Sequence, residues 1–170
     1  MRVTVRLPRP LLDEVRADLV KPHRFAAERV GFLYGRLCHA GEGRKLVLMT
    51  GYATVSDDRY IDDPSAGARI DSHAIREAMQ GVLDRGEGAF HVHLHDHRGT
   101  PRLSPMDRAE IPRLIPSFRA VGPQLAHGLI ILSRDRCIAD VWLPGSIKPV
   151  EAERVAVVGY PLLLAERSKP

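Results

Sequence analysis

The chain has 170 residues, the length of one domain with a substantial core, so we expect residues 1–170 to form a single domain. Hydrophobic residues make up 44% and charged residues 27%, proportions that are ordinary for a globular protein. No apolar run approaches the roughly 20 residues of a membrane span, and no apolar signal-peptide core follows the start. We therefore expect a cytoplasmic protein with no membrane partner.

The net charge is +4, but the basic residues are scattered along the chain rather than gathered in a run. Aromatic residues make up 5% and do not alternate with arginines in a stacking pattern, so the sequence argues against nucleic-acid binding. An acidic partner surface is compatible with this charge. Cys38 and Cys137 lack a paired spacing, which predicts buried thiols rather than a disulfide or a zinc knuckle.

The first third of the chain predicts strands, a helix and a loop. An alternating pattern predicts a strand over residues 2–7, and an apolar stripe predicts a helix after Pro10. The stripe consists of Leu11, Leu12, Val15 and Leu19. Further strands are expected near residues 25–38 and 45–55. The polar residues 56–69, which include four aspartates, predict a mobile loop.

Two further helices are expected, with a strand between them. The first begins at a cap at Ser72. Its expected buried face consists of Ile75, Met79, Val82 and Leu83. A strand over residues 88–93 follows, and then a helix that begins at Ser104 and that Pro112 and Pro116 shorten or kink.

The last part of the chain predicts a hairpin of residues 127–133 and 137–143 around a turn at residues 134–135. Residues 155–164 predict a strand or a short helix. His127 begins an apolar strand, which favours a structural histidine. Together these elements predict an α/β fold, with a mixed β-sheet and flanking helices.

Histidines occupy every second position in the segment from His91 to His97. In a strand, alternate side chains share one face, so His91 and His93 can point at one cation while a carboxylate completes three protein ligands and leaves a position for water. This layout is typical of a catalytic metal rather than a structural one. Two histidines two residues apart are a weak signal alone, because they also occur on solvated strands.

Two further segments carry candidate functional groups. Ser104 can cap a helix with Pro105 at its first position, which places Asp107 at the third. This arrangement can serve as a cap alone, or place both side chains at a cleft. Glu28 opens an apolar segment that predicts a buried strand, where an unpaired carboxylate is costly, and it is the best candidate for proton transfer.

These residues resemble the JAMM (MPN+, JAB) metalloproteases, which remove ubiquitin and ubiquitin-like proteins. Residues 28–35 match the family's Glu-x-x-Gly-x-Leu-x-Gly pattern at every fixed position. Residues 88–93 resemble the apolar strand that carries the two histidines, and residues 104–107 match Ser-x-x-Asp. The resemblance covers about residues 20–145 and implies the mixed sheet of an MPN/JAB (cytidine-deaminase-like) domain.

The sequence departs from the family pattern in two places. Leu94 stands where the family has proline, and the ten residues between His93 and Ser104 form a longer loop than the family's. His93 and His95 would give a loop closer to the usual length. We prefer His91 and His93, because an apolar run precedes His91 directly and residues 95–99 have the composition of a polar loop.

The resemblance implies one Zn²⁺ per chain, bound by His91, His93 and Asp107, although these ligand types also suit iron or manganese. It implies that Glu28 moves the proton and that Ser104 hydrogen-bonds the carbonyl oxygen as it becomes an oxyanion. The implied reaction is hydrolysis of a peptide or isopeptide bond after the C-terminus of a ubiquitin-like protein.

Within the family, the chain looks most like the deconjugases of bacterial ubiquitin-like (Bil-type) conjugation systems, some of which serve antiphage defence. Activating-enzyme-like and conjugating-enzyme-like proteins are then expected partners. The alternatives are a peptidase that trims a sulfur-carrier protein and a catalytically silent MPN-like scaffold. We further expect residues 56–69 and 95–103 to form the walls that hold an extended substrate tail.

Overall fold

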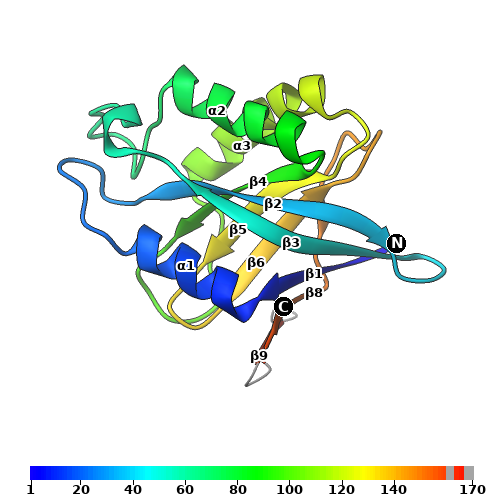
Figure 1. Cartoon of the computed structure of the whole chain (residues 1–170). Helices are drawn as coiled ribbons and strands as arrows, with labels where there is room; N and C mark the ends of the chain where they lie inside the picture. Colours follow the sequence, from blue (N-terminus) through cyan, green and yellow to red (C-terminus); the bar gives the residue numbers. More distant parts are fainter. Residues whose placement is uncertain (160–162, 167–170) are drawn as a thin grey trace.

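The computed structural model describes residues 1–159 and 163–166 of the chain (Figure 1). Within these residues it has three α-helices: α1 (Arg9–Leu19), α2 (Ser72–Arg85) and α3 (Pro105–Val121). The strands are β1 (Arg2–Pro8), β2 (Val30–His39), β3 (Arg44–Thr54), β4 (Gly88–Leu94), β5 (His127–Leu132), β6 (Cys137–Trp142), β7 (Val150–Glu151), β8 (Arg154–Val158) and β9 (Leu163–Glu166). The predicted α/β fold with a mixed sheet is confirmed.

All the described strands belong to one sheet, in the order β7-β6-β5-β4-β2-β3-β1-β8-β9. β1 is parallel to β3 and β8, and β4 is parallel to β5, whereas the other neighbours are antiparallel. The sheet curls, because the chain between β7 and β8 bonds to two distant strands. Ala152 N–H donates to the Ala139 carbonyl of β6, and Glu153 N–H donates to the Val3 carbonyl of β1, each at 2.8 Å.

The helices lie on opposite faces of the sheet, with α1 on one side and α2 and α3 on the other (Figure 1). Side-chain alternation in β4 divides its residues between these two layers. Phe90 and Val92 pack into the same apolar cluster as Leu12 and Val15 of α1. The intervening residues of β4 therefore face α2 and α3, and this is the side on which His91 and His93 lie.

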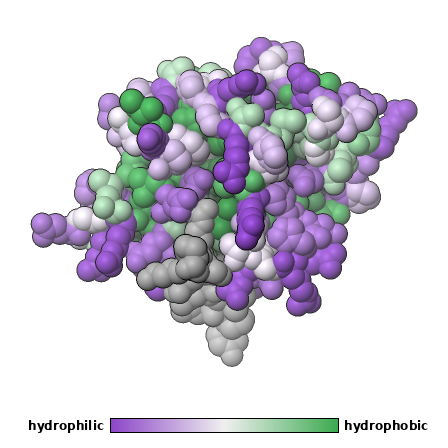
Figure 2. Space-filling model, turned by 180° about the vertical axis from the view of Figure 1, so that it is seen from behind, coloured by the Kyte–Doolittle hydropathy of each residue, from purple (hydrophilic) through white to green (hydrophobic). Residues whose placement is uncertain are grey.

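Exposed apolar side chains are dispersed over the molecule. The most exposed of them include Val20 after α1, Leu83 on α2 and Ile147 before β7. Figure 2, which views the molecule from behind, shows small apolar areas among hydrophilic side chains. Over the described part of the chain, no helix combines the length and the apolar character that a membrane crossing requires.

Several expected elements are confirmed, including β1, helix α1 with its stripe, and the β5–β6 hairpin. Both cysteines are free, with Cys137 buried and Cys38 half-buried. The expected loop at residues 56–69 contains a 3-10 helix, Asp57–Arg59, and Tyr60 pairs with Ile70 at its end. For the segment predicted at residues 155–164, the structure gives β8 and the start of β9, and residues 160–162 lie outside the described part.

Three details of the expected elements are wrong. The strand predicted over residues 25–38 begins only at Val30, so Glu28 precedes it. The cap of α2 is Asp71, whose Oδ1 accepts the Ala74 N–H at 2.9 Å, and Leu83 is 55% exposed. Val82 of the predicted face is buried, together with Ala74 and Ala78, whereas Ile75 and Met79 are half-buried.

Helix α3 is not shortened by its prolines, since it runs through Pro112 and Pro116 to Val121. Both prolines lie one turn apart on the exposed side of the helix. Water can therefore satisfy the carbonyl groups that lose their helical N–H partners there.

Candidate metal centre

The parallel pairing of β4 with β5 determines the positions of His93 and His95. His93 lies opposite Ile131, and Leu94 lies opposite Leu132. Beyond the end of β4, the His95 N–H still donates to the Leu132 carbonyl, at 2.9 Å. The extended backbone therefore continues for one more residue, and His95 lies on the same face as His93 rather than in a free loop.

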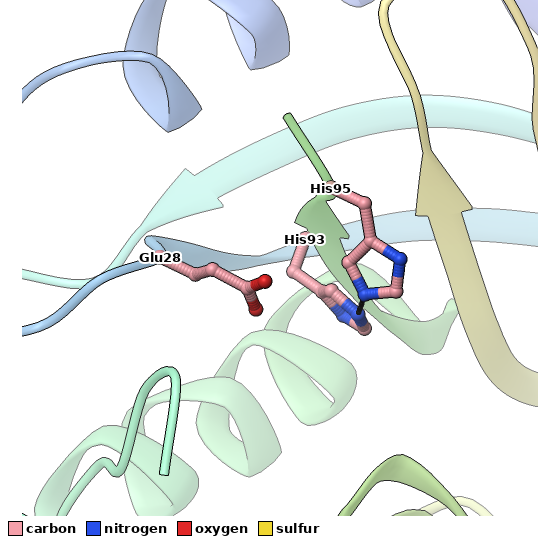
Figure 3. A group of neighbouring side chains, drawn as sticks. All are labelled: Glu28, His93 and His95. Carbon is pink, nitrogen blue, oxygen red and sulfur yellow. Dashed lines mark hydrogen bonds between the residues drawn. The ribbon is translucent and has the colours of Figure 1, made fainter. Parts of the chain in front are cut away.

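His93 and His95 bring their ring nitrogens together, with 3.1 Å between the two Nε2 atoms. One ligand atom each from Glu28, His93 and His95 lies within 4.8 Å of the others, and Figure 3 shows the Glu28 carboxylate pointing toward the histidines. Two nitrogens bound to one tetrahedral zinc ion lie about 3.4 Å apart. The spacing of the two histidines thus suits a single ion, and these residues could hold a metal.

Asp107 lies beside this pair and is fixed by the start of α3. Its backbone N–H donates to Ser104 Oγ at 3.1 Å, and its Oδ2 accepts the Ser104 N–H at 2.7 Å, so the predicted cap is confirmed as a capping box. Asp107 Oδ1 lies 3.4 Å from His93 Nε2, and Oδ2 lies 3.9 Å from His95 Nε2. Each histidine thus has one Asp107 oxygen within 3.9 Å, which makes Asp107 a further candidate ligand beside the group of Glu28, His93 and His95.

Electrostatics keep Asp107 anionic. Burial alone would raise the pKa of its carboxyl group, but the hydrogen bond and charge of His93 and the two bonds from Ser104 outweigh burial and lower this pKa. Burial lowers the pKa of His95, and the nearby His93 lowers it further. The anionic carboxylate of Asp107 and the neutral imidazole of His95, which these shifts favour, are the forms in which those side chains bind a metal.

Glu28 reaches the site from the segment that precedes β2. Its N–H donates to the Gly67 carbonyl at 3.0 Å. Its carboxylate packs against Gly67, since a Cβ built there would lie 3.0 Å from Glu28 Oε2. The expected proton-transfer group is therefore at the centre, but a loop contact positions it instead of the predicted strand.

His91 lies on β4 outside the group of Glu28, His93 and His95. Its ring packs edge-on against Phe32, and its Nδ1 is buried with no hydrogen-bond partner among the described residues. Burial, and then the adjacent His93, lower its pKa to about 3. The structure thus brings together the alternative pair, His93 and His95, while the preferred pair of His91 and His93 stays a prediction from the sequence. His97 is exposed beyond them.

An open cleft of about 520 Å³ contains Glu28, His91, His93, Ser104 and Asp107. One wall consists of residues around Gly67, and the other consists of the first turns of α3. Its volume falls in the usual range for ligand sites. None of the residues 95–103, the second expected wall, lines this cleft; His95 therefore reaches His93 from outside the lining, whereas His91 lies within it. The β5–β6 hairpin holds the 95–103 loop.

The hairpin contacts come from three consecutive positions. Ser133 Oγ donates to the Gly99 carbonyl at 2.7 Å, and Asp135 Oδ1 accepts the Gly99 N–H at 2.8 Å. Arg134 Nε donates to Asp96 Oδ1 at 2.7 Å. These bonds fasten the loop at the end of β4 and thereby support the position of His95.

His127 is structural, as its sequence context predicted. It is fully buried, its Nδ1 accepts the Ala89 N–H at 3.1 Å, and its Nε2–H donates to the Gly122 carbonyl at 2.9 Å. Burial lowers its pKa, although the Gly122 bond opposes this effect. Both ring nitrogens are satisfied, so His127 is not a candidate ligand.

Comparison with models of known protein families gave no match to this chain. Comparison with curated proteins gave no match either. The chemistry and geometry of the cleft are therefore the observations that bear on its function.

Proposed function

We propose that the chain is a zinc-dependent peptidase or isopeptidase of the JAMM type, which hydrolyses the bond after the C-terminus of a ubiquitin-like protein. The observation that carries this proposal is the convergence of Glu28, His93 and His95 within 4.8 Å of one another, beside the Asp107 carboxylate. These groups come from three separate segments, and they occur in the order of the family's sequence pattern.

His93, His95 and Asp107 would hold the ion. Two imidazoles and a carboxylate are a common ligand set for catalytic zinc. A zinc ion held by these residues would supply Lewis-acid chemistry, which activates water at neutral pH and polarises a substrate carbonyl group. The capping box holds Asp107 in place before any ion binds, so this ligand requires little ordering on binding.

Glu28 and Ser104 act on the substrate side of the cleft. The Glu28 carboxylate accepts the proton of the attacking water and passes it to the leaving nitrogen. Ser104 Oγ already accepts the Asp107 N–H, and no described residue accepts its hydroxyl proton. This proton remains to be donated to the carbonyl oxygen as negative charge develops, a contribution on the order of 3 kcal/mol.

The substrate is an extended tail that lies between residues 63–70 and α3, both of which line the cleft. Small residues beside the scissile bond suit this arrangement, because a bulky side chain would collide with the walls as the backbone approaches the ion. The cleft would receive the same C-terminal tail whether the enzyme removes the ubiquitin-like protein from a conjugate or trims its precursor.

The test combines metal content with cleavage of a ubiquitin-like protein fused to a reporter. We expect about one zinc per chain, and we expect Glu28→Gln to keep the zinc and the fold while losing at least 100-fold in turnover. Glu14→Gln is the matched control, because it makes the same change on an exposed position of α1, on the opposite face of the sheet. Near-normal cleavage by Glu28→Gln would remove Glu28 from the mechanism.

Two other functions predict different outcomes of this test. A silent MPN-like scaffold should bind no stoichiometric zinc and cleave no fusion. A sulfur-carrier peptidase should cleave a carrier-protein precursor in preference to a ubiquitin-like fusion. Equal cleavage of an unstructured peptide would indicate a general peptidase.

A further inference from the structure

Glu28 owes its place in the cleft to contacts from a distant segment. It precedes β2, and its N–H bonds to the Gly67 carbonyl at 3.0 Å. Gly67 also packs against its carboxylate. The carboxylate position therefore depends on how the segment that carries Gly67 is held relative to the start of β2.

Arg29 fixes the start of β2 from the other side of the backbone. Its side chain is only 7% exposed. Its Nε donates to the Lys21 carbonyl at 2.9 Å, and its Nη2 donates to the Pro22 carbonyl at 3.2 Å. The same Nη2 donates to Asp57 Oδ1 at 2.7 Å. Arg29 thus ties β2 to the 3-10 helix that opens the 56–69 segment.

Tyr60 completes the connection. Its hydroxyl accepts the Val30 N–H at 3.0 Å and donates to the Val30 carbonyl at 3.2 Å, and the Arg29 guanidinium lies over its ring at 5.9 Å. Tyr60 also pairs with Ile70 across the base of the segment that contains Gly67. Arg29, Asp57 and Tyr60 therefore connect the start of β2 to the segment that carries Gly67. Gly67 in turn contacts Glu28, so the chain of contacts is closed.

We propose that Arg29 and Asp57 are positioning residues, whose ion pair sets the Glu28 carboxylate relative to His93 and His95. This inference rests on the proposed function, because it assigns the ion pair a role in proton transfer. Asp57 is 68% exposed, so water screens its carboxylate, and the Lys21 and Pro22 carbonyls still accept bonds from the buried Arg29 guanidinium when that carboxylate is lost. Displacement of a catalytic group by about 1 Å can lower a rate about 100-fold. The ion pair should therefore affect turnover far more than stability.

The experiment compares Asp57→Asn with Asp58→Asn, its matched control. Asp58 lies in the same 3-10 helix and is exposed, but its carboxylate bonds to Ser56 instead of Arg29. In the zinc-loaded protein, we expect Asp57→Asn to lower kcat about 10-fold, with KM, zinc content and melting temperature nearly unchanged. Asp58→Asn should behave as the wild type, and Asp57→Glu should restore most of the kcat.

Two further measurements separate positioning from a purely structural role. In the Glu28→Gln background, Asp57→Asn should cause no further loss of turnover, because the group that it positions is already inactive. Amide hydrogen exchange at the Glu28 N–H should be faster in Asp57→Asn and unchanged in Asp58→Asn. Wild-type kcat in Asp57→Asn, or additive losses in the double variant, would overturn the inference.

The two proposals fail in different ways. If the wild type binds zinc and cleaves the fusion, while Asp57→Asn changes neither kcat nor the exchange of the Glu28 N–H, the inference alone is wrong. If the wild type cleaves nothing, the proposed function is wrong, and the catalytic role of the ion pair is overturned with it.

Discussion

Removal of His95 is the perturbation that distinguishes the two possible histidine pairs. The structure places His95 Nε2 at 3.1 Å from His93 Nε2 and 3.9 Å from Asp107 Oδ2. His95→Ala therefore leaves two of the three proposed ligands. Free zinc at about 100 times its Kd stabilises the wild type by about 2.7 kcal/mol. For a domain of this size, that corresponds to a rise of about 5–11 °C in Tm.

The assay is thermal unfolding of the metal-free protein with and without zinc, together with elemental analysis. We expect His95→Ala to lose the rise in Tm and the bound zinc. His91→Ala should keep both, although its baseline Tm will be lower, since it leaves a cavity in the helix-facing layer. His97→Ala is the matched control, because this exposed histidine follows the same spacing of every second residue. If His95→Ala keeps the zinc while His91→Ala loses it, the ligand pair is His91 and His93, and the reasoning from the distances is wrong.

Three further predictions concern the surroundings of the site. Ser104→Ala removes the cap at the Asp107 N–H and should lower the free energy of unfolding in urea by about 1 kcal/mol. It should also lower turnover more than 10-fold, and unchanged turnover would exclude Ser104 from the reaction. Gly67→Ala adds a Cβ 3.0 Å from Glu28 Oε2, so it should displace the carboxylate and lower kcat several-fold with little change in urea midpoint; a wild-type kcat would contradict the close packing. Burial lowers the folded-state pKa of His127 below the unfolded value of about 6.5, so the unfolded state binds the proton first as the pH falls. The stability that His127 contributes should be present above about pH 6.5 and be lost below it, and urea unfolding between pH 8 and 5 should show a smaller decrease for His127→Gln than for the wild type.

Local patterns in the sequence predict much of this fold, because many of its helices and strands are determined by residues that are neighbours in the chain. Alternation predicts β1, two apolar segments around a turn predict the β5–β6 hairpin, and the Ser-Pro start predicts α3 with its cap. Long-range contacts determine what the patterns miss. β2 begins at Val30, after Glu28, and at that residue Tyr60, distant in sequence, bonds to both the N–H and the carbonyl of Val30.

The same limit applies to the site. The polar composition of residues 95–99 suggests a loop, yet the bond from His95 to Leu132 extends the strand geometry by one residue. The sequence signals for His95 are the shorter loop to Ser104 and its position two residues after His93, which places both on one strand face. Arg29 and Gly67 give no such signal, because their roles depend on partners many residues away.

The histidines at every second position from His91 to His97 also determine which insertions or deletions β4 can accept. Insertion of one residue in β4 would turn His93 toward α1 and put Phe90 or Val92 into the cleft, so both core and site would be lost. A slip of two residues is different, because His91, His93, His95 and His97 repeat with the period of the strand. It would bring another histidine pair to the same place opposite Asp107. Such a strand can change its register in steps of two during evolution and still place two imidazoles beside Asp107.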